Sequence, residues 1–141
     1  MMAPRSVVLD NEAVSALLDP GHTKHRRMLA RIEVAASRNL VRAGAVELLV
    51  PTSVRVEAGW DRQAAGAAPV NRLRVHDAPL DTATANQAAR LRRDLAVSVA
   101  DAHVGAVLAA AAKPVAVITS DVADLRRIAG HLGVQATIVA V

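Results

Sequence analysis

The stretch "VITSDVADL", Val117–Leu125, holds the pattern that decides the fold. An apolar run ends abruptly at Thr119–Asp121, and a second acid follows at Asp124. A similar run near the start of the chain, "VVLDNEA" at Val7–Ala13, ends in Asp10. Continuous apolar runs, as opposed to alternating ones, are typical of strands that are buried on both faces. The sequence therefore predicts two buried strands that each deliver a carboxylate at their exit.

Strand-like and helix-like segments alternate along the rest of the chain. The expected strands are Ser6–Leu9, Glu47–Val50, Leu73–His76, Val115–Thr119 and Gln135–Val139. The expected helices are Asn11–Leu18, His22–Arg38, a helix capped by Thr52 or Ser53 that runs to about Ala65, Asp81–Arg93, about Val99–Ala112, and Asp121–Leu132. Such alternation predicts an α/β fold with a mostly parallel sheet and helices on both faces. Neither a repeat nor a linker interrupts residues 1–141, so we expect a single domain.

The composition narrows the class of protein. A hydrophobic content of 52% in 141 residues excludes a disordered chain and allows a sizeable core. One Trp and no Tyr or Phe argue against nucleic-acid recognition by aromatic stacking. The absence of Cys excludes disulfides and thiolate metal sites. Basic residues outnumber acidic ones by 17 to 13, which permits binding to a polyanion without demonstrating it.

The expected cellular location is inferred from the apparent lack of a membrane span and of a signal peptide. No segment reaches the roughly 18 consecutive apolar residues of a membrane span. The N-terminal "MMAPRSVV" lacks a long apolar stretch followed by a small-residue cleavage site. We therefore expect a cytoplasmic protein that does not enter a membrane.

Asp10 and Asp121 are candidate functional residues because of their position. In open α/β sheets, ligands bind at the carboxyl ends of the strands, where both acids are expected. Each acid also has a structural explanation, since Asp is a favoured helix N-cap and Asp121 with Asp124 imitates a capping box. The two acids meet only if their strands are neighbours, which the residues alone do not establish.

Asp101 is the third candidate acid. Its spacing from Ser98 is that of a capping box, which is again a structural explanation. Yet it shares a helix face with Val104, Gly105 and Leu108 at i+3, i+4 and i+7. We therefore expect Asp101 at the start of a buried stripe.

Glu57 is the fourth candidate. If Ser53 caps its helix, the capping-box partner falls at Val56 and not at Glu57. Glu57 follows Val54 by three residues and precedes Ala58, so we expect it on a face that is at least partly buried. A surface glutamate is the alternative, since buried charges are seldom unpaired.

Taken together, the four acids suggest a metal site. Crowded carboxylates cannot all stay ionised without a counter-charge. Ligand sets made of oxygen alone suit Mg²⁺ or Mn²⁺. Such ions activate water and neutralise the charge that develops on a phosphodiester. A carboxylate-held metal in a basic chain therefore points to phosphodiester hydrolysis.

Four segments carry a resemblance to a known family: "VVLDNEAVSALL", "PTSVRVEAGW", "VADAHVGAVLAA" and "AVITSDVADLRRI". In this order and spacing they resemble a PIN-domain ribonuclease of the VapC type, the toxic half of a bacterial toxin–antitoxin pair. The resemblance covers essentially the whole chain. It implies a parallel five-stranded sheet in the order 3-2-1-4-5, with Asp10 and Asp121 on adjacent strands.

The resemblance also implies residue roles and partners. The implied catalytic acids are Asp10, Glu57, Asp101 and Asp121, of which the three aspartates hold Mg²⁺, with Mn²⁺ as a substitute. Supporting roles fall to Thr119, Asn11 and Asp124; Asn11 departs from the small or hydroxyl residue that many members carry. The family further implies a homodimer, a VapB-like antitoxin in a groove between the first helices, and cleavage of structured RNA such as tRNA or rRNA. The Arg-rich helix expected at His22–Arg38 could supply phosphate contacts or simply be a solvated face.

Two other functions remain open. A phospho-receiver signalling domain has a similar architecture, but its lysine stands at a strand exit, whereas Lys113 follows a helix. The only candidate phospho-acceptor after Leu73–His76 is Asp77, which is followed by Ala78 and Pro79. A PIN-like module that binds RNA or a partner without cutting is the second alternative, and only the presence of all four acids argues against it.

Overall fold

The computed structural model describes residues 3–41 and 46–141, and the side chains of 37–41 are outside the description. The strands are β1 (Ser6–Leu9), β2 (Glu47–Pro51), β3 (His76–Ala78), β4 (Val115–Thr119) and β5 (Ala136–Ala140). The helices are α1 (Asn11–Leu18), α2 (His25–Val41), α3 (Thr52–Ala58), α4 (Ala68–Asn71), α5 (Thr82–Leu95), α6 (Val99–Ala110) and α7 (Val122–Leu132), with a 3₁₀ turn at Ala65–Ala67.

The five strands form one parallel sheet in the order β3-β2-β1-β4-β5. In the centre, Val8 of β1 pairs with Leu49 of β2 on one side and with Val117 of β4 on the other. All three side chains are buried, as continuous apolar strands require. The parallel sheet and the implied strand order are therefore confirmed, and β1 and β4 are neighbours.

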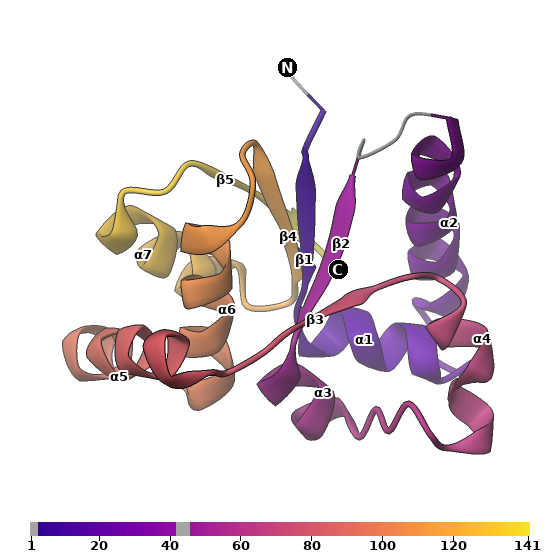
Figure 1. Cartoon of the computed structure of the whole chain (residues 1–141), viewed down its shortest axis with the longest axis horizontal. Coiled ribbons are helices and arrows are strands. Elements are labelled where there is room, and N and C mark those ends of the chain that lie inside the picture. Colours follow the sequence, from indigo (N-terminus) through magenta and orange to yellow (C-terminus); the bar gives the residue numbers. More distant parts are fainter. Residues whose placement is uncertain (1–2, 42–45) are drawn as a thin grey trace.

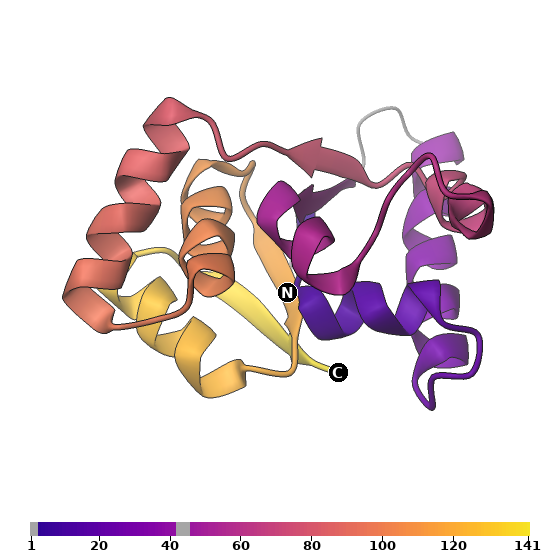
Figure 2. The same ribbon diagram turned by 90° about the horizontal axis from the view of Figure 1, so that it is seen from below.

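Helices lie on both faces of this sheet, as expected. Helices α5, α6 and α7 gather on one face and α2 stands on the other, while α1 and α3 lie at the carboxyl ends of the strands (Figures 1 and 2). Within the described residues, no helix combines the length and the apolar character needed to cross a bilayer.

Helix α6 is buried along most of its length. Every residue from Ala100 to Leu108 is buried, and a Cβ on Gly105 would lie 2.6 Å from Cγ2 of Ile128 and 3.0 Å from Cδ1 of Leu91. The missing side chain lets Leu91 of α5 and Ile128 of α7 approach the backbone of α6 closely. The expectation that Asp101 starts a buried stripe is confirmed.

Helix α3 is shorter than expected. It ends at Ala58 and not near Ala65, because Gly59 adopts a left-handed conformation with φ of 73°. The N–H of Gly59 donates to Val56 O and that of Trp60 to Arg55 O, which is the usual closure of a helix by glycine.

Two other elements begin three residues later than expected, and the remaining boundaries differ by smaller shifts. Helix α2 begins at His25 instead of His22, because the preceding residues form a turn in which His22 N donates to Asp19 O. Strand β3 is His76–Ala78 and not Leu73–His76, because Leu73 N donates to Val70 O in a turn and Arg74 adopts a left-handed conformation with φ of 56°. Neither shift moves a candidate acid.

Candidate metal centre

The exits of β1 and β4 bring Asp10 and Asp121 to the same edge of the sheet. Leu9 pairs with Ile118 in the register, and Asp10 N donates to Ile118 O at 3.0 Å. Asp121 stands two residues beyond the end of β4 at Thr119. The two apolar runs with acids at their ends therefore converge, as the predicted sheet implied.

Asp10 is held from two sides. Its Oδ2 accepts a hydrogen bond of 2.6 Å from Thr119 Oγ1, and its Oδ1 accepts one of 2.7 Å from Asn11 N. The side chain is only 3% exposed. Asp10 also occupies the N-cap position of α1, so the capping explanation and the functional one apply to the same residue.

Thr119 connects the two strand exits. Besides donating to Asp10, its Oγ1 accepts a hydrogen bond of 2.9 Å from the backbone N–H of Asp121. One hydroxyl thereby orients a carboxylate on β1 and the backbone that carries a second carboxylate after β4. This is the orienting contact expected of a group that supports metal ligands.

Asp101 reaches the same edge from α6. Ser98 caps this helix, with its Oγ accepting from Asp101 N at 3.0 Å, so the Ser98–Asp101 spacing does reflect a helix start. The Asp101 side chain is nevertheless buried, at 6% exposure.

The three aspartates form one cluster. One carboxylate oxygen each from Asp10, Asp101 and Asp121 can be chosen so that all three lie within 4.8 Å of one another. Asp10 and Asp101 are buried, whereas Asp121 is exposed, so the cluster opens to solvent on one side. This donor set fits a hard divalent cation such as Mg²⁺, which takes oxygen ligands and keeps part of its water shell.

The close packing of these carboxylates changes the pKa values of two of them. Burial, together with the negative charges of Asp10, Asp121 and Asp124, raises the pKa of Asp101 to about 7. Burial also raises the pKa of Asp10, although the hydrogen bonds from Thr119 and Asn11 act in the opposite direction. A bound cation would supply the missing counter-charge and hold the acids ionised.

Helix capping does not account for Asp121. It stands at the N-cap position of α7, but its side chain makes no capping hydrogen bond. Asp124 lies outside the three-acid cluster, and its Oδ1 accepts from Nη1 of Arg127 at 3.2 Å on the surface. The proposed capping box of Asp121 and Asp124 is therefore wrong.

The expected burial of Glu57 is also wrong, since its side chain is exposed. Pro51, and not Thr52 or Ser53, occupies the N-cap position of α3, and the helix ends one residue after Glu57. The Glu57 side chain therefore faces solvent near the end of α3. Among the described residues, the cluster does not include Glu57.

Asn11 contributes to the site through its backbone. Its N–H donates to Asp10, whereas its side-chain Oδ1 is buried and finds no partner among the described residues.

Sequence reasoning missed His103, which lies two residues after Asp101 on the buried helix. Its ring is fully buried, with Nδ1 2.7 Å from Ser53 Oγ, and burial lowers its pKa, which favours the neutral form of the ring. The bond joins α6 to α3, and it explains why Ser53 does not act as a cap. The available signal was a lone imidazole in a helix whose other residues, apart from Asp101, are small or apolar.

Lys113 does not serve the acid cluster. Its Nζ donates to the carbonyl oxygens of Leu108, Ala109 and Ala111 at 2.8, 3.1 and 2.6 Å, so it closes the end of α6. A receiver domain needs its lysine beside its acids, and this arrangement removes that alternative.

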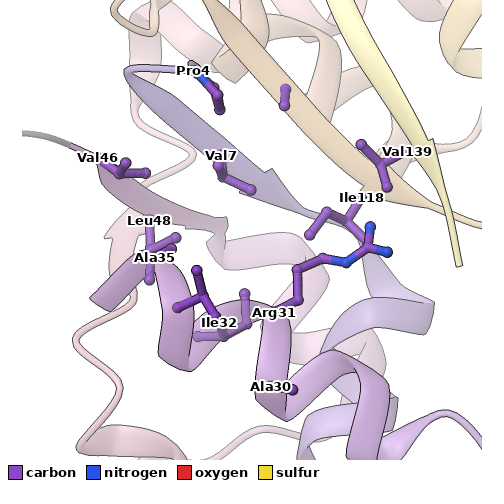
Figure 3. A pocket seen from close by; sticks show the side chains of 12 residues that line it. Pro4, Val7, Ala30, Arg31, Ile32, Ala35, Val46, Leu48, Ile118 and Val139 are labelled. Atoms are coloured by element: carbon purple, nitrogen blue, oxygen red, sulfur yellow. The ribbon is translucent and has the colours of Figure 1, made fainter. Parts of the chain in front are cut away.

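A second feature lies on the other face of the sheet. Between α2 and the strands runs an apolar groove of ≈ 450 Å³, whose walls include Ile32, Ala35, Leu48 and Ile118. Figure 3 shows Arg31 of α2 extending across it toward Ile118.

Comparison with known proteins supports the architecture. No family model and no curated protein sequence matches the chain. The structure is similar to a chain in the crystal structure of VapBC2 from Rickettsia felis bound to a DNA fragment from their promoter, with a TM-score of 0.60. That match has 9% sequence identity and covers 96% of this chain and 98% of the other. The chain therefore has the fold that the resemblance to VapC-type PIN domains implied, with an acidic cluster at the sheet edge.

Proposed function

We propose that the protein is a metal-dependent endoribonuclease and the toxin of a VapBC-type pair, which cleaves structured RNA such as tRNA or rRNA and so inhibits translation. The observation that carries the proposal is the cluster of Asp10, Asp101 and Asp121 at the carboxyl edge of the sheet. Structural capping explains Asp10 in part but leaves the exposed Asp121 without a structural role.

Asp10, Asp101 and Asp121 would hold Mg²⁺, for which Mn²⁺ could substitute. The ion, when bound, activates water and neutralises the charge that develops on the phosphodiester. Thr119 keeps Asp10 oriented, and the Ser98 cap sets the first turn of α6, from which Asp101 projects. Glu57 remains a predicted catalytic acid. It lies outside the cluster of three aspartates, and its exposed carboxylate is accessible to a substrate.

The basic charge of the chain suits an RNA substrate. Arg26, Arg27 and Arg31 of α2 are exposed and have the charge needed for phosphate contacts. An RNA substrate involved in translation also agrees with the proposed cytoplasmic location.

The proposal includes a VapB-like antitoxin and a homodimer. The fold match to a VapBC2 chain supports the antitoxin as a class of partner. We assign it the groove of Figure 3, where apolar side chains of a peptide would meet the groove walls and an acidic one would meet Arg31. Co-expression with the product of a small adjacent reading frame should then suppress toxicity.

The decisive experiment is sequencing of RNA 5′ ends after induced expression, combined with cleavage of the mapped RNA by purified protein. Cleavage should require Mg²⁺ or Mn²⁺ and stop in excess EDTA. Asp10→Asn is the matched control and should produce no new 5′ ends. Cleavage that persists in EDTA would remove the metal from the mechanism, and the absence of any new 5′ ends would contradict the nuclease assignment.

A further inference from the structure

The sheet has two edge strands, and they differ in how their outer edges are protected. Strand β3 is only three residues long. Its Asp77 is bound by Arg55 at 2.7 Å and by Arg62 at 2.8 Å, and Pro79 directly follows the strand. Short length, charge and proline are the usual means by which proteins keep an edge strand from pairing with another chain. The β3 edge is therefore protected against further strands.

Strand β5, at the opposite edge, lacks this protection. Its five residues, Ala136–Ala140, pair with β4 on one side, and no strand of the described residues pairs with the other side. The segment "VQATIVAV", Val134–Val141, contains no charged side chain and no proline. An edge strand with this composition is a template for pairing with an added strand.

The backbone groups that β5 offers to such a strand follow from its contacts with β4. Val141 N donates to Thr119 O at 3.0 Å, so Val141 bonds toward β4. Successive residues of a strand direct their backbone groups to opposite sides. Val139 therefore also bonds toward β4, whereas Ile138 and Ala140 direct their N–H and C=O groups away from the sheet.

A hollow flanks this edge on each face of the sheet. On the face covered by α7, a hollow of ≈ 550 Å³, here called the α7 hollow, is lined by Ala136 and Ile138 of β5 and by Arg126 of α7. It is open at Gly130, where an added Cβ would meet nothing within 4 Å. On the other face lies the groove of Figure 3, which Val139 lines. The side chains of an added strand would point alternately to the two faces, and so toward both hollows.

The charges beside β5 select the kind of strand that fits. The lining of the α7 hollow includes Arg126, the lining of the groove includes Arg31, and neither lining includes an acid. Both arginines are exposed, and within residues 3–41 and 46–141 neither has an ion pair. A second copy of this chain would bring like charges together, whereas an acidic segment would meet an arginine on each face.

We propose that an extended, acidic segment of the antitoxin adds to β5 as a sixth strand, with its backbone paired to Ile138 and Ala140 and its carboxylates directed to Arg31 and Arg126. In this mode of recognition, backbone hydrogen bonds supply affinity and the flanking pockets supply specificity. The proposal rests on the antitoxin partner proposed above, for which it names a binding mode, but it does not depend on the cleavage of RNA.

The test uses a fluorescein-labelled eight-residue peptide in which pairs of valines alternate with pairs of glutamates, so that each face of the strand presents both residue types. Fluorescence anisotropy measures its binding to the wild-type protein. A peptide with lysine in place of glutamate should bind at least about tenfold more weakly. Arg126→Glu should weaken binding of the glutamate peptide about three- to tenfold. The matched control is Arg72→Glu, an exposed position at the end of α4 and before the β3 edge, which should leave binding unchanged.

The backbone pairing has a separate readout. Ala140→Pro removes an outward N–H without removing a bond to β4, and it should weaken peptide binding about tenfold. Ala140→Ser keeps the N–H and should bind like the wild type. In the wild type, the peptide should protect the N–H groups of Ile138 and Ala140 from hydrogen exchange. Circular dichroism checks the fold of the proline variant; if that variant is unfolded, the exchange measurement on the wild type decides.

Three outcomes would overturn the proposal. They are equal binding of the glutamate and lysine peptides, binding without protection of Ile138 and Ala140, and self-association of the wild type that Ala140→Pro abolishes, which would assign the edge to a second copy. If the peptide does not bind although the co-expressed antitoxin suppresses toxicity, the β5 site alone fails. If the peptide binds as expected but no RNA is cleaved, the β5 site stands and the nuclease function fails.

Discussion

The hydroxyl of Thr119 donates a hydrogen bond of 2.6 Å to Oδ2 of Asp10, although the two residues are 109 positions apart in the chain. Both side chains are buried, and the same hydroxyl accepts from the backbone of Asp121. The bond therefore couples the exits of the adjacent strands β1 and β4, and with them two of the three carboxylates of the cluster.

Thr119→Val should remove this coupling. Loss of the hydroxyl leaves the buried Asp10 carboxylate without one donor and the N–H of Asp121 without its acceptor. We expect a loss of about 1–3 kcal/mol in the free energy of unfolding, measured by urea denaturation, and weaker metal binding. Thr119→Ser keeps the hydroxyl and is the control. Equal metal affinity in the valine and serine variants would show that the bond does not position Asp10.

Asp10→Asn should abolish cleavage and leave the protein folded. The amide retains an oxygen for the N–H of Asn11, and the loss of one charge relieves repulsion within the cluster. In the absence of metal, its stability should equal or slightly exceed that of the wild type. Circular dichroism and urea denaturation measure this, and an unfolded variant would mean that Asp10 is needed chiefly for structure.

The metal-free protein should lose stability as the pH rises from about 4 to 7. Because the pKa of Asp101 is raised to about 7, the folded protein keeps a proton there that the unfolded chain has released. One such proton lowers the free energy of unfolding by at most ~1.4 kcal/mol per pH unit. Urea denaturation in EDTA at several pH values measures the slope.

Asp101→Asn provides the control for this pH dependence, because the variant lacks the titrating group and should show a smaller slope. Saturating Mg²⁺ should reduce the wild-type slope, since the ion binds the ionised acids. Identical slopes in the wild type and in Asp101→Asn would show that Asp101 titrates as an ordinary aspartate.

Asp121 and Asp124 should differ in their effects. Asp121 belongs to the cluster, whereas Asp124 pairs on the surface with Arg127. Asp121→Asn should therefore lower Mn²⁺ affinity by more than ~100-fold, and Asp124→Asn by less than ~10-fold. Both should change stability by at most about 1 kcal/mol, because surface ion pairs contribute little and Asp121 makes no capping bond. Calorimetric titration measures both affinities, and an equal loss would make Asp124 a fourth ligand.

The features that the sequence predicts best are those with a strong local signal. Continuous apolar strands followed by acids place Asp10 and Asp121 at one edge, and the spacing of Asp101 from Val104 and Leu108 places it on a buried face. The convergence of these acids needs the strand order, which followed only from the family resemblance and not from any local pattern.

What the sequence predicts poorly depends on contacts between distant residues. The capping role expected for Ser53 was wrong because its hydroxyl bonds to His103, 50 positions away. The burial expected for Glu57 was wrong, and α3 is about two turns shorter than expected because Gly59 ends it at Ala58. That glycine was a readable stop signal.

Anomalous diffraction from crystals grown with Mn²⁺ tests the central claim most directly. The account predicts a manganese peak between Asp10, Asp101 and Asp121, with one carboxylate oxygen of each residue in its coordination sphere, and its disappearance in Asp121→Asn crystals. A fully occupied manganese elsewhere on the protein, with no peak between these three carboxylates, would contradict the claim that they form the metal centre.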